Sequence, residues 1–168
     1  MAADIIMDLF TTAGQGTVDE VRRIVNKGVD VNTSVALGTQ GLMTPLLTAV
    51  RYNRNAEEVA KFLISQGANV NAKQENGMSS LFYAMGNGSV AVAELLISHG
   101  ADVNARLDDG CTPLHIAAEK GQDVIARSLI SKGANVNAKN NRGHAPLAIA
   151  EHFKHTAVAQ YIRSQGGR

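Results

Sequence analysis

Three parts of the 168-residue chain hold residues whose types and spacing could support chemistry. His115 lies in the segment GCTPLHIAAEKG, His152 and His155 are three residues apart, and the segment GNGSVA (86–91) follows the pattern G-x-G-x-x-A. A histidine can act as a general base, a histidine pair can bind zinc, and a glycine-rich turn before a helix can bind the phosphates of a dinucleotide. Each site would need further residues from its surroundings.

The surroundings of the three segments do not supply those residues. The dinucleotide pattern requires a preceding strand, whereas the segment SLFYAM before it has the pattern of a helix. Beside His152 and His155, only Glu151 could add a metal ligand at a fitting spacing. Nothing near Cys111 marks an activated thiolate. We therefore expect no catalytic residue, no metal site and no cofactor, in a protein that is not an enzyme.

The segment around His115 recurs along the chain. Gly77, Gly110 and Gly143 follow one another at intervals of 33 residues, and LISQGANVNA, LISHGADVNA and LISKGANVNA repeat at the same interval. A fixed period of this length is typical of a solenoid whose units stack on one another. The period, the TPLH segment and the G-A-D/N-V-N tail together resemble the ankyrin-repeat family, and the resemblance covers essentially the whole chain.

The resemblance implies an all-α repeat solenoid of stacked helix-turn-helix units with β-hairpin or loop fingers. We expect a single domain, 1–168, with repeats at about 4–32, 33–73, 74–106, 107–139 and 140–168. In repeat four, Thr112 can cap the first helix, Pro113 suits its first turn and Gly121 suits its end. Asp109-Gly110 predicts a hairpin turn in the finger. In repeat two, the spacing predicts two extra residues in the turn between the helices.

The first and last repeats carry charges at positions that are apolar in the other repeats. Glu20 takes the position of Val59, Val92, Ile125 and Val158, and Arg163 takes the position of Val25, Ile64, Ile97 and Ile130. Terminal repeats of a solenoid need a polar outer face. We therefore expect 1–168 to be a complete array in which repeats one and five act as caps.

His115 takes a position that has no shared chemistry. The other repeats have Phe10, Leu47, Phe82 and Ala148 there. In ankyrin-repeat proteins the histidine of TPLH typically braces the threonine hydroxyl and nearby backbone. The resemblance therefore implies a structural role for His115.

The composition limits the classes of partner. The chain has 16 Lys+Arg and 15 Asp+Glu, a net charge of +1, no Trp and 4% aromatic residues, which argues against nucleic acid and anionic membranes. A single cysteine fits a reducing compartment. The N-terminal MAADIIMDLF lacks the positive charge of a secretory signal. We expect a monomer in the cytoplasm, with the nucleus as the alternative.

The resemblance implies that another protein binds the concave face, which is the surface formed by the fingers and the first helix of each repeat. Residues that vary between repeats on this face are free to recognise a partner. On the fingers the predicted contact residues are Met43, Glu75, Asn76, Met78, Asp108, Asp109, Cys111, Asn141, Arg142 and His144. On the first helices they are Arg51, Tyr52, Asn87, Glu119, Lys120, His152 and Phe153. The predicted function is that of a non-enzymatic adaptor, scaffold or inhibitor.

Two alternative functions also follow from the resemblance. Ankyrin arrays resemble the targets of the asparaginyl hydroxylase of the hypoxia response, which carry a finger asparagine eight residues after a leucine. Asn71, Asn104 and Asn137 have this spacing. Bracing of the finger through side-chain hydrogen bonds is the favoured role for them, and it is compatible with modification. The size and repeat number also fit a small kinase inhibitor of the cyclin-dependent-kinase-inhibitor type.

The finger between repeats one and two is four residues longer than the others. The insertion lies within TSVALGTQGLM, between Asn32 and Thr44, and stacking of the repeats does not require it. Unless it folds back, it exposes Val35, Leu37, Leu42 or Met43. Long loops on a rigid scaffold often carry function. We therefore predict that the strongest partner contacts lie at this end, on the extended finger with Arg51 and Tyr52.

Overall fold

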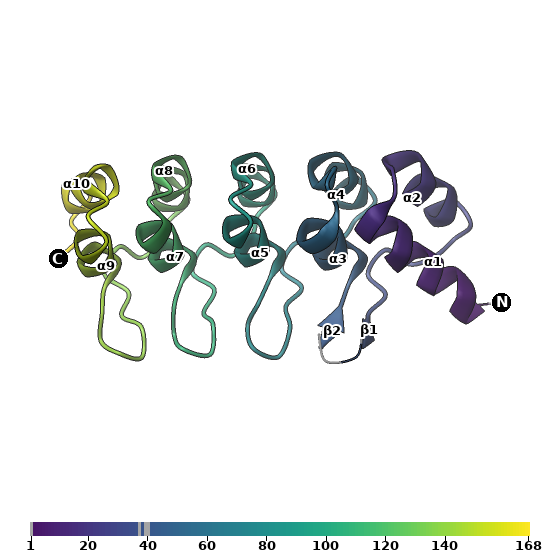
Figure 1. The fold of residues 1–168 in the computed structure, drawn as a ribbon, viewed down its shortest axis with the longest axis horizontal. Coiled ribbons are helices and arrows are strands. Elements are labelled where there is room, and N and C mark those ends of the chain that lie inside the picture. Colours follow the sequence, from purple (N-terminus) through teal and green to yellow (C-terminus); the bar gives the residue numbers. More distant parts are fainter. Residues whose placement is uncertain (1, 37, 39–40) are drawn as a thin grey trace.

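The computed structural model describes residues 2–36, 38 and 41–168, which form five helix pairs stacked side by side (Figure 1). The pairs are α1 (Ala2–Gln15) with α2 (Val18–Val25), α3 (Pro45–Tyr52) with α4 (Ala56–Ser65), α5 (Ser80–Gly86) with α6 (Val90–Ser98), α7 (Pro113–Lys120) with α8 (Asp123–Ser131), and α9 (Pro146–His152) with α10 (Thr156–Ser164). The fingers extend from the row of first helices, all in the same direction. The predicted repeat solenoid is confirmed.

The helix boundaries follow from a few residues. Proline occupies the first position of α3, α7 and α9, where its missing N–H removes no helical hydrogen bond. Gly121 ends α7 in the left-handed region, with φ 66°. Lys154 takes the corresponding position after α9 with φ 62°, and it is the one residue other than glycine with positive φ in the described part of the chain.

The fingers of repeats three to five are closed by tight turns. In the fourth, the backbone N–H of Leu107 donates to the carbonyl of Cys111 at 3.0 Å, and that of Gly110 donates to Leu107 at 2.8 Å. Regular strands among the described residues occur only in the extended finger, where β1 (Val35–Ala36) pairs antiparallel with β2 (Leu42–Met43). The turn expected at Asp109-Gly110 is thus present, without regular strands on either side of it.

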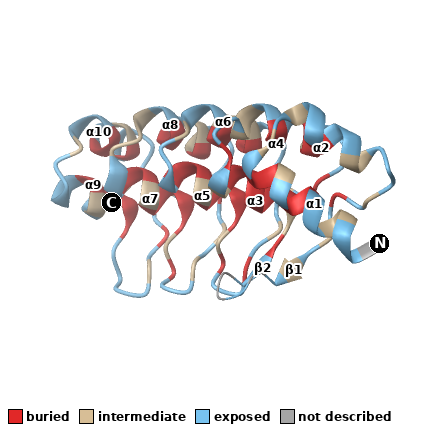
Figure 2. Ribbon diagram, turned by 45° about the vertical axis from the view of Figure 1, so that its right-hand side comes forward, coloured by how far each residue is buried: buried red, intermediate tan, exposed pale blue. Residues whose placement is uncertain are grey.

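One hydrophobic core runs through all five repeats. First helices contact first helices, and second helices contact second helices, so each unit buries its apolar side on its neighbours. Figure 2 shows buried residues along the row of first helices. A second, smaller cluster of Phe10, Met43 and Leu47 lies beside the extended finger. No helix of the described residues is long and apolar enough to cross a membrane.

The link between α3 and α4 contains one extra residue rather than the expected two. It has three residues, against two between α7 and α8, and the second inserted residue lengthens α4 to ten residues where α8 has nine. Buried Asn53 holds this link against repeat one, because its Nδ2 donates to the carbonyls of Ala13 at 2.8 Å and Gly16 at 2.9 Å. A polar side chain can be buried here because its bonds to carbonyls replace those to water.

The two charged positions at the ends of the array are exposed. The carboxylate of Glu20 accepts a bond from the backbone N–H of Thr17 at 2.7 Å, which caps α2 and lowers the pKa of Glu20. Arg163 forms an ion pair with Glu151. The apolar residues at the position of Glu20, such as Val59 and Ile125, are fully buried. Those at the position of Arg163 are buried in the case of Ile97 and partly buried in the other repeats. The outer sides of repeats one and five are therefore polar where the inner repeats are covered.

Candidate functional site

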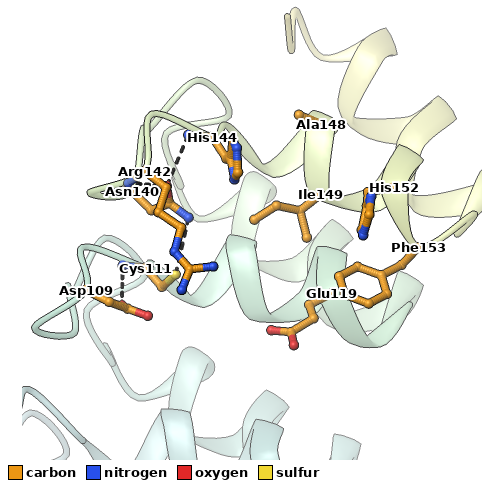
Figure 3. A pocket seen from close by; sticks show the side chains of 10 residues that line it. All are labelled: Asp109, Cys111, Glu119, Asn140, Arg142, His144, Ala148, Ile149, His152 and Phe153. Atoms are coloured by element: carbon orange, nitrogen blue, oxygen red, sulfur yellow. Dashed lines mark hydrogen bonds between the residues drawn. The ribbon is translucent and has the colours of Figure 1, made fainter.

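A hollow of about 490 Å³ lies at the C-terminal end of the concave face, between the fingers and first helices of repeats four and five (Figure 3). Its lining is Asp109, Cys111, Glu119, Asn140, Arg142, His144, Ala148, Ile149, His152 and Phe153. We call it the C-terminal hollow. Seven of these residues are predicted contact residues, namely Asp109, Cys111, Glu119, Arg142, His144, His152 and Phe153. The structure thus brings together predicted residues from two fingers and two helices.

The finger side of the C-terminal hollow is held by side-chain bonds to backbone. Oδ1 of Asn140 accepts bonds from the N–H groups of Arg142 and His144, both at 3.0 Å. Oδ1 of Asp109 accepts from the N–H of Cys111 at 2.9 Å. Burial raises the pKa of the Cys111 thiol, which keeps it protonated at neutral pH and therefore a weak nucleophile. This side is a rigid surface that presents a guanidinium, an imidazole and a carboxylate.

Aromatic rings form the helix side of the C-terminal hollow. The ring of Phe153 is 49% exposed and meets the ring of His152 edge to face, with centroids 5.0 Å apart. It also stacks with the ring of His155 at 6.3 Å. Nε2 of His155 is bonded to the carbonyl of Glu119 at 2.9 Å, which ties repeat five to α7. The ring of Phe153 is thus fixed in place while half of it faces solvent.

His152 and His155, the pair whose spacing could hold zinc, contact an aromatic ring and a backbone carbonyl instead. His152 contacts Phe153, and the ring nitrogen of His155 is used by a backbone carbonyl. Within the described residues, no group of three histidine, cysteine or acidic side chains could hold a metal ion.

Three lining residues were not predicted from the sequence: Asn140, Ala148 and Ile149. Ala148 takes the position that Phe10, Leu47, Phe82 and His115 fill in the other repeats, and those four side chains are buried whereas Ala148 is exposed. A small residue at a position that is otherwise filled leaves space on the concave face. The small Ala148 in the segment APLA therefore indicates the hollow, and comparison of the repeats could have revealed it.

The prediction that Met43 contacts a partner is wrong. Its exposed fraction is 0%, and it packs with Phe10 and Leu47 in the smaller core cluster. At the described ends of the extended finger, Val35–Ala36 pairs with Leu42–Met43. Neighbouring side chains of a strand point to opposite sides, so Leu42 is exposed and Met43 is buried. Leu37, also considered for this finger, lies outside the described residues.

Arg51 serves to connect two repeats rather than to present a free charge. Its guanidinium lies between the rings of Tyr52 and Tyr83, at 5.0 and 4.9 Å from their centroids, and its Nη1 donates to the Tyr83 hydroxyl at 2.8 Å. The Tyr83 hydroxyl in turn donates to Gln74, whose Nε2 lies 3.3 Å from Sδ of Met43. Burial raises the pKa of Tyr83. These contacts link the extended finger to repeat three.

Tyr52 is the exposed member of this N-terminal group. Its side chain is 47% exposed and lines a second hollow, the N-terminal hollow, of about 340 Å³. The other lining residues are Met7, Phe10, Thr11, Gly14, Gln15 and Thr48. This hollow is formed by α1 and α3 and contains no charged side chain.

The remaining predicted contact residues divide into exposed side chains and braces. Glu75, Asp108 and Lys120 are exposed. Asn87 donates to the carbonyl of Val50 at 3.1 Å, so it braces repeat three against repeat two. The side chains of Asn76 and Asn141 also bond to backbone, to the N–H of Met78 at 3.1 Å and to the carbonyl of Asp108 at 2.9 Å. Met78 itself is partly buried.

The finger asparagines hold neighbouring repeats together. Nδ2 of Asn71 donates to the carbonyl of Gly100 at 3.0 Å, and its Oδ1 accepts from the N–H of Asp102 at 2.7 Å. Asn32, Asn104 and Asn137 make the corresponding bonds to the next repeat. The bracing role that the sequence suggested for Asn71, Asn104 and Asn137 is confirmed.

His115 is also a brace. It is 1% exposed; its Nδ1 accepts from the backbone N–H of Thr112 at 3.1 Å, and its Nε2 lies 3.0 Å from the carbonyl of His144. A backbone N–H can only donate and a carbonyl can only accept, so the ring must be neutral with its proton on Nε2. Burial lowers the pKa of His115, in agreement with a neutral ring. The predicted structural role is confirmed.

Comparison with family models agrees with this geometry. Residues 9–107 match the model described as ankyrin repeats (3 copies), and residues 109–141 match the model described as ankyrin repeat. No curated protein matches the chain. Ankyrin repeats generally mediate protein–protein interaction and are generally not enzymes. The repeat period, the stacked fold and the family matches agree, and the matches together cover most of the chain. The chain therefore belongs to the ankyrin-repeat family.

Proposed function

We propose that this chain is a non-enzymatic interaction module that binds a protein partner on its concave face. The observation that carries the proposal is the C-terminal hollow, where seven residues that vary between repeats meet on one surface. The residues that support this surface have their hydrogen-bonding groups paired within the fold, as Asn140 and His115 show. A rigid frame with exposed variable side chains costs little conformational entropy when a partner binds.

Two titratable groups at the C-terminal hollow, His115 and Cys111, are held by the fold rather than available for chemistry. Catalytic acids and bases need an accessible atom and a pKa near the working pH. His115 is buried and uses both ring nitrogens in bonds, and the Cys111 thiol is held protonated. Neither group offers a base or nucleophile to a substrate.

Affinity capture with paired variants tests the proposal. The bait would be the full chain, the concave-face double variant Tyr52→Ala with Phe153→Ala, or the control Val124→Ala, which shortens an exposed side chain on α8. Quantitative mass spectrometry would measure the proteins that each bait retains. We expect the control to retain the same partners as the unmodified chain and the double variant to lose them. Equal retention by all three baits would contradict binding on the concave face.

A further inference from the structure

Ion pairing differs between the two sides of the array. Four ion pairs join two described residues, and each includes a residue of a second helix: Asp19–Arg22, Glu57–Lys61, Asp123–Arg127 and Glu151–Arg163. Among the predicted contact residues of the concave face, the exposed carboxylates are Glu75, Asp108, Asp109 and Glu119. None of the four forms an ion pair within residues 2–36, 38 and 41–168. These four carboxylates therefore carry charge that no ion pair neutralises, on a face that also carries the exposed cations Lys120 and Arg142.

The position of Glu119 is unfavourable for the isolated fold. It lies in the last turn of α7, which ends at Lys120, and the partial charge at the C-terminal end of a helix is negative. Adjacent residues on a helix do not face each other, so Lys120 does not compensate for this carboxylate. Glu119 nevertheless lines the C-terminal hollow. Its charge is better explained by something that binds there than by the stability of α7.

The C-terminal hollow places this charge next to an apolar surface. Figure 3 shows Glu119 and Phe153 on the helix side of the hollow and Asp109 on the finger side. The half-exposed ring of Phe153 and the partly buried side chain of Ile149 provide apolar contact area. Asp109 is held by its bond to the N–H of Cys111, so its carboxylate has a defined place. A segment that combines a positive charge with an apolar group would complement Glu119, Asp109 and Phe153.

We propose that the C-terminal hollow binds an extended segment of the partner protein that carries a basic side chain close to an aromatic or aliphatic one. This proposal rests on the proposed function and names the kind of segment that the concave face recognises. The apolar side chain lies against Phe153, and the ammonium or guanidinium group pairs with Glu119 and Asp109. A volume of about 490 Å³ is within the range of sites that enclose small ligands and side chains.

Arg142 provides a test of the sign of the charge. It lines the same hollow, and Figure 3 shows its side chain on the finger side beside Cys111. A cationic segment is repelled by this guanidinium and attracted by Glu119. Removing the two charges must therefore change the affinity in opposite directions, whereas general damage to the hollow would weaken binding in both variants.

The experiment selects phage-displayed random peptides of roughly twelve residues on the full chain, because segments of this kind are common recognition elements. The enriched peptides would be synthesised, and their dissociation constants measured by fluorescence anisotropy. We expect enriched peptides to carry Arg or Lys within about three positions of an aromatic or aliphatic residue. Glu119→Gln and Asp109→Asn should each weaken binding about fivefold, Phe153→Ala about tenfold, and Arg142→Gln should tighten it about twofold.

Matched controls are available on the second helices, away from the concave face. Glu58→Gln removes an exposed carboxylate on α4, and Val124→Ala shortens an exposed apolar side chain on α8; both should leave the affinity within twofold. Asp109→Asn keeps an oxygen for the N–H of Cys111, so the turn is preserved. Thermal melts would confirm that each variant is folded.

The possible outcomes separate this inference from the proposed function. Enrichment of acidic peptides, no enrichment over a surface without protein, or affinities that do not respond to Glu119→Gln would overturn the inference. Peptides that lose affinity in Tyr52→Ala but not in Phe153→Ala would also overturn it, while leaving binding on the concave face intact. Peptides that respond to neither of these changes would contradict the proposed function itself.

Discussion

The two ends of the concave face use their variable residues differently. At the N-terminal end, Met43 is buried and Arg51 is enclosed by two tyrosine rings, so both hold repeats together. At the C-terminal end, Glu119 and Arg142 line a hollow without an ion pair among the described residues, and Phe153 is half exposed. Variation between repeats therefore compensates for a local irregularity of the array in the first case. In the second case we propose that it serves a partner, because these side chains are exposed and form no ion pair among the described residues.

The largest expected effect concerns the extended finger. Met43→Ala should lower the free energy of unfolding by about 2–5 kcal/mol, because it removes a fully buried side chain and leaves a cavity beside Phe10 and Leu47. The neighbouring change Leu42→Ala removes an exposed side chain and should cost less than about 0.5 kcal/mol. Urea denaturation of both variants measures the difference. Equal, small losses would show that Met43 is not part of the core.

A smaller effect on stability is expected at His115, beneath the C-terminal hollow. His115→Ala should lower the free energy of unfolding by about 1–2 kcal/mol, because it removes bonds to Thr112 and to the carbonyl of His144. Because the ring is buried, we expect a partner to bind the folded variant with little change. A folded His115→Ala protein that no longer binds would place His115 in the binding site and contradict its assignment as a brace.

The turn after α9 should be stabilised by a glycine, the residue that the turn after α7 already has at the same position. Lys154 is held at φ 62°, a conformation unfavourable for residues with a Cβ, so Lys154→Gly should raise the free energy of unfolding by about 1 kcal/mol. The converse change Gly121→Ala should be destabilising, because a Cβ there would lie 2.6 Å from Nδ1 of His155. Thermal melts of the two variants should shift in opposite directions, and a shift in the same direction would contradict this explanation.

The smallest effect is a dependence of stability on pH. The pKa of His115 is lower in the folded than in the unfolded chain, so the folded chain binds fewer protons. The stabilisation is complete above the ordinary histidine pKa of about 6.5 and is lost as the pH falls through that value towards the lower folded pKa. Urea denaturation from neutral to mildly acidic pH should show a decline that is smaller in His115→Ala. An identical decline in both proteins would mean that His115 does not contribute.

The regular part of the fold could be predicted from the sequence because its causes are local. Pro113 and Gly121 specify where α7 begins and ends through their own backbone preferences, and each repeat contains similar signals. The bracing by His115 could be predicted from the resemblance to the ankyrin-repeat family, and one of its partners, Thr112, is three residues away. The same holds for most of the C-terminal hollow, whose exposed residues follow directly from the repeat positions.

The N-terminal end could not be predicted in this way because its contacts are distant in sequence. Arg51 bonds to Tyr83, which belongs to the next repeat, and no residue near Arg51 in the sequence indicates that bond. Whether Met43 points inward depends on the register of β1 against β2, and a shift of one residue would have exposed it. The number of inserted residues is visible in the sequence, but their pairing is not.

We propose that Arg51 serves the fold and Phe153 serves a partner. The most direct test measures two quantities for Arg51→Ala and Phe153→Ala: the free energy of unfolding in urea and the dissociation constant for a peptide selected on the full chain. We predict that Arg51→Ala loses about 1–2 kcal/mol of stability and keeps its affinity within twofold, because only ring and hydroxyl contacts are removed. Phe153→Ala should keep its stability within about 0.5 kcal/mol and lose affinity about tenfold. The reverse pattern, with affinity lost in Arg51→Ala and retained in Phe153→Ala, would contradict the claim.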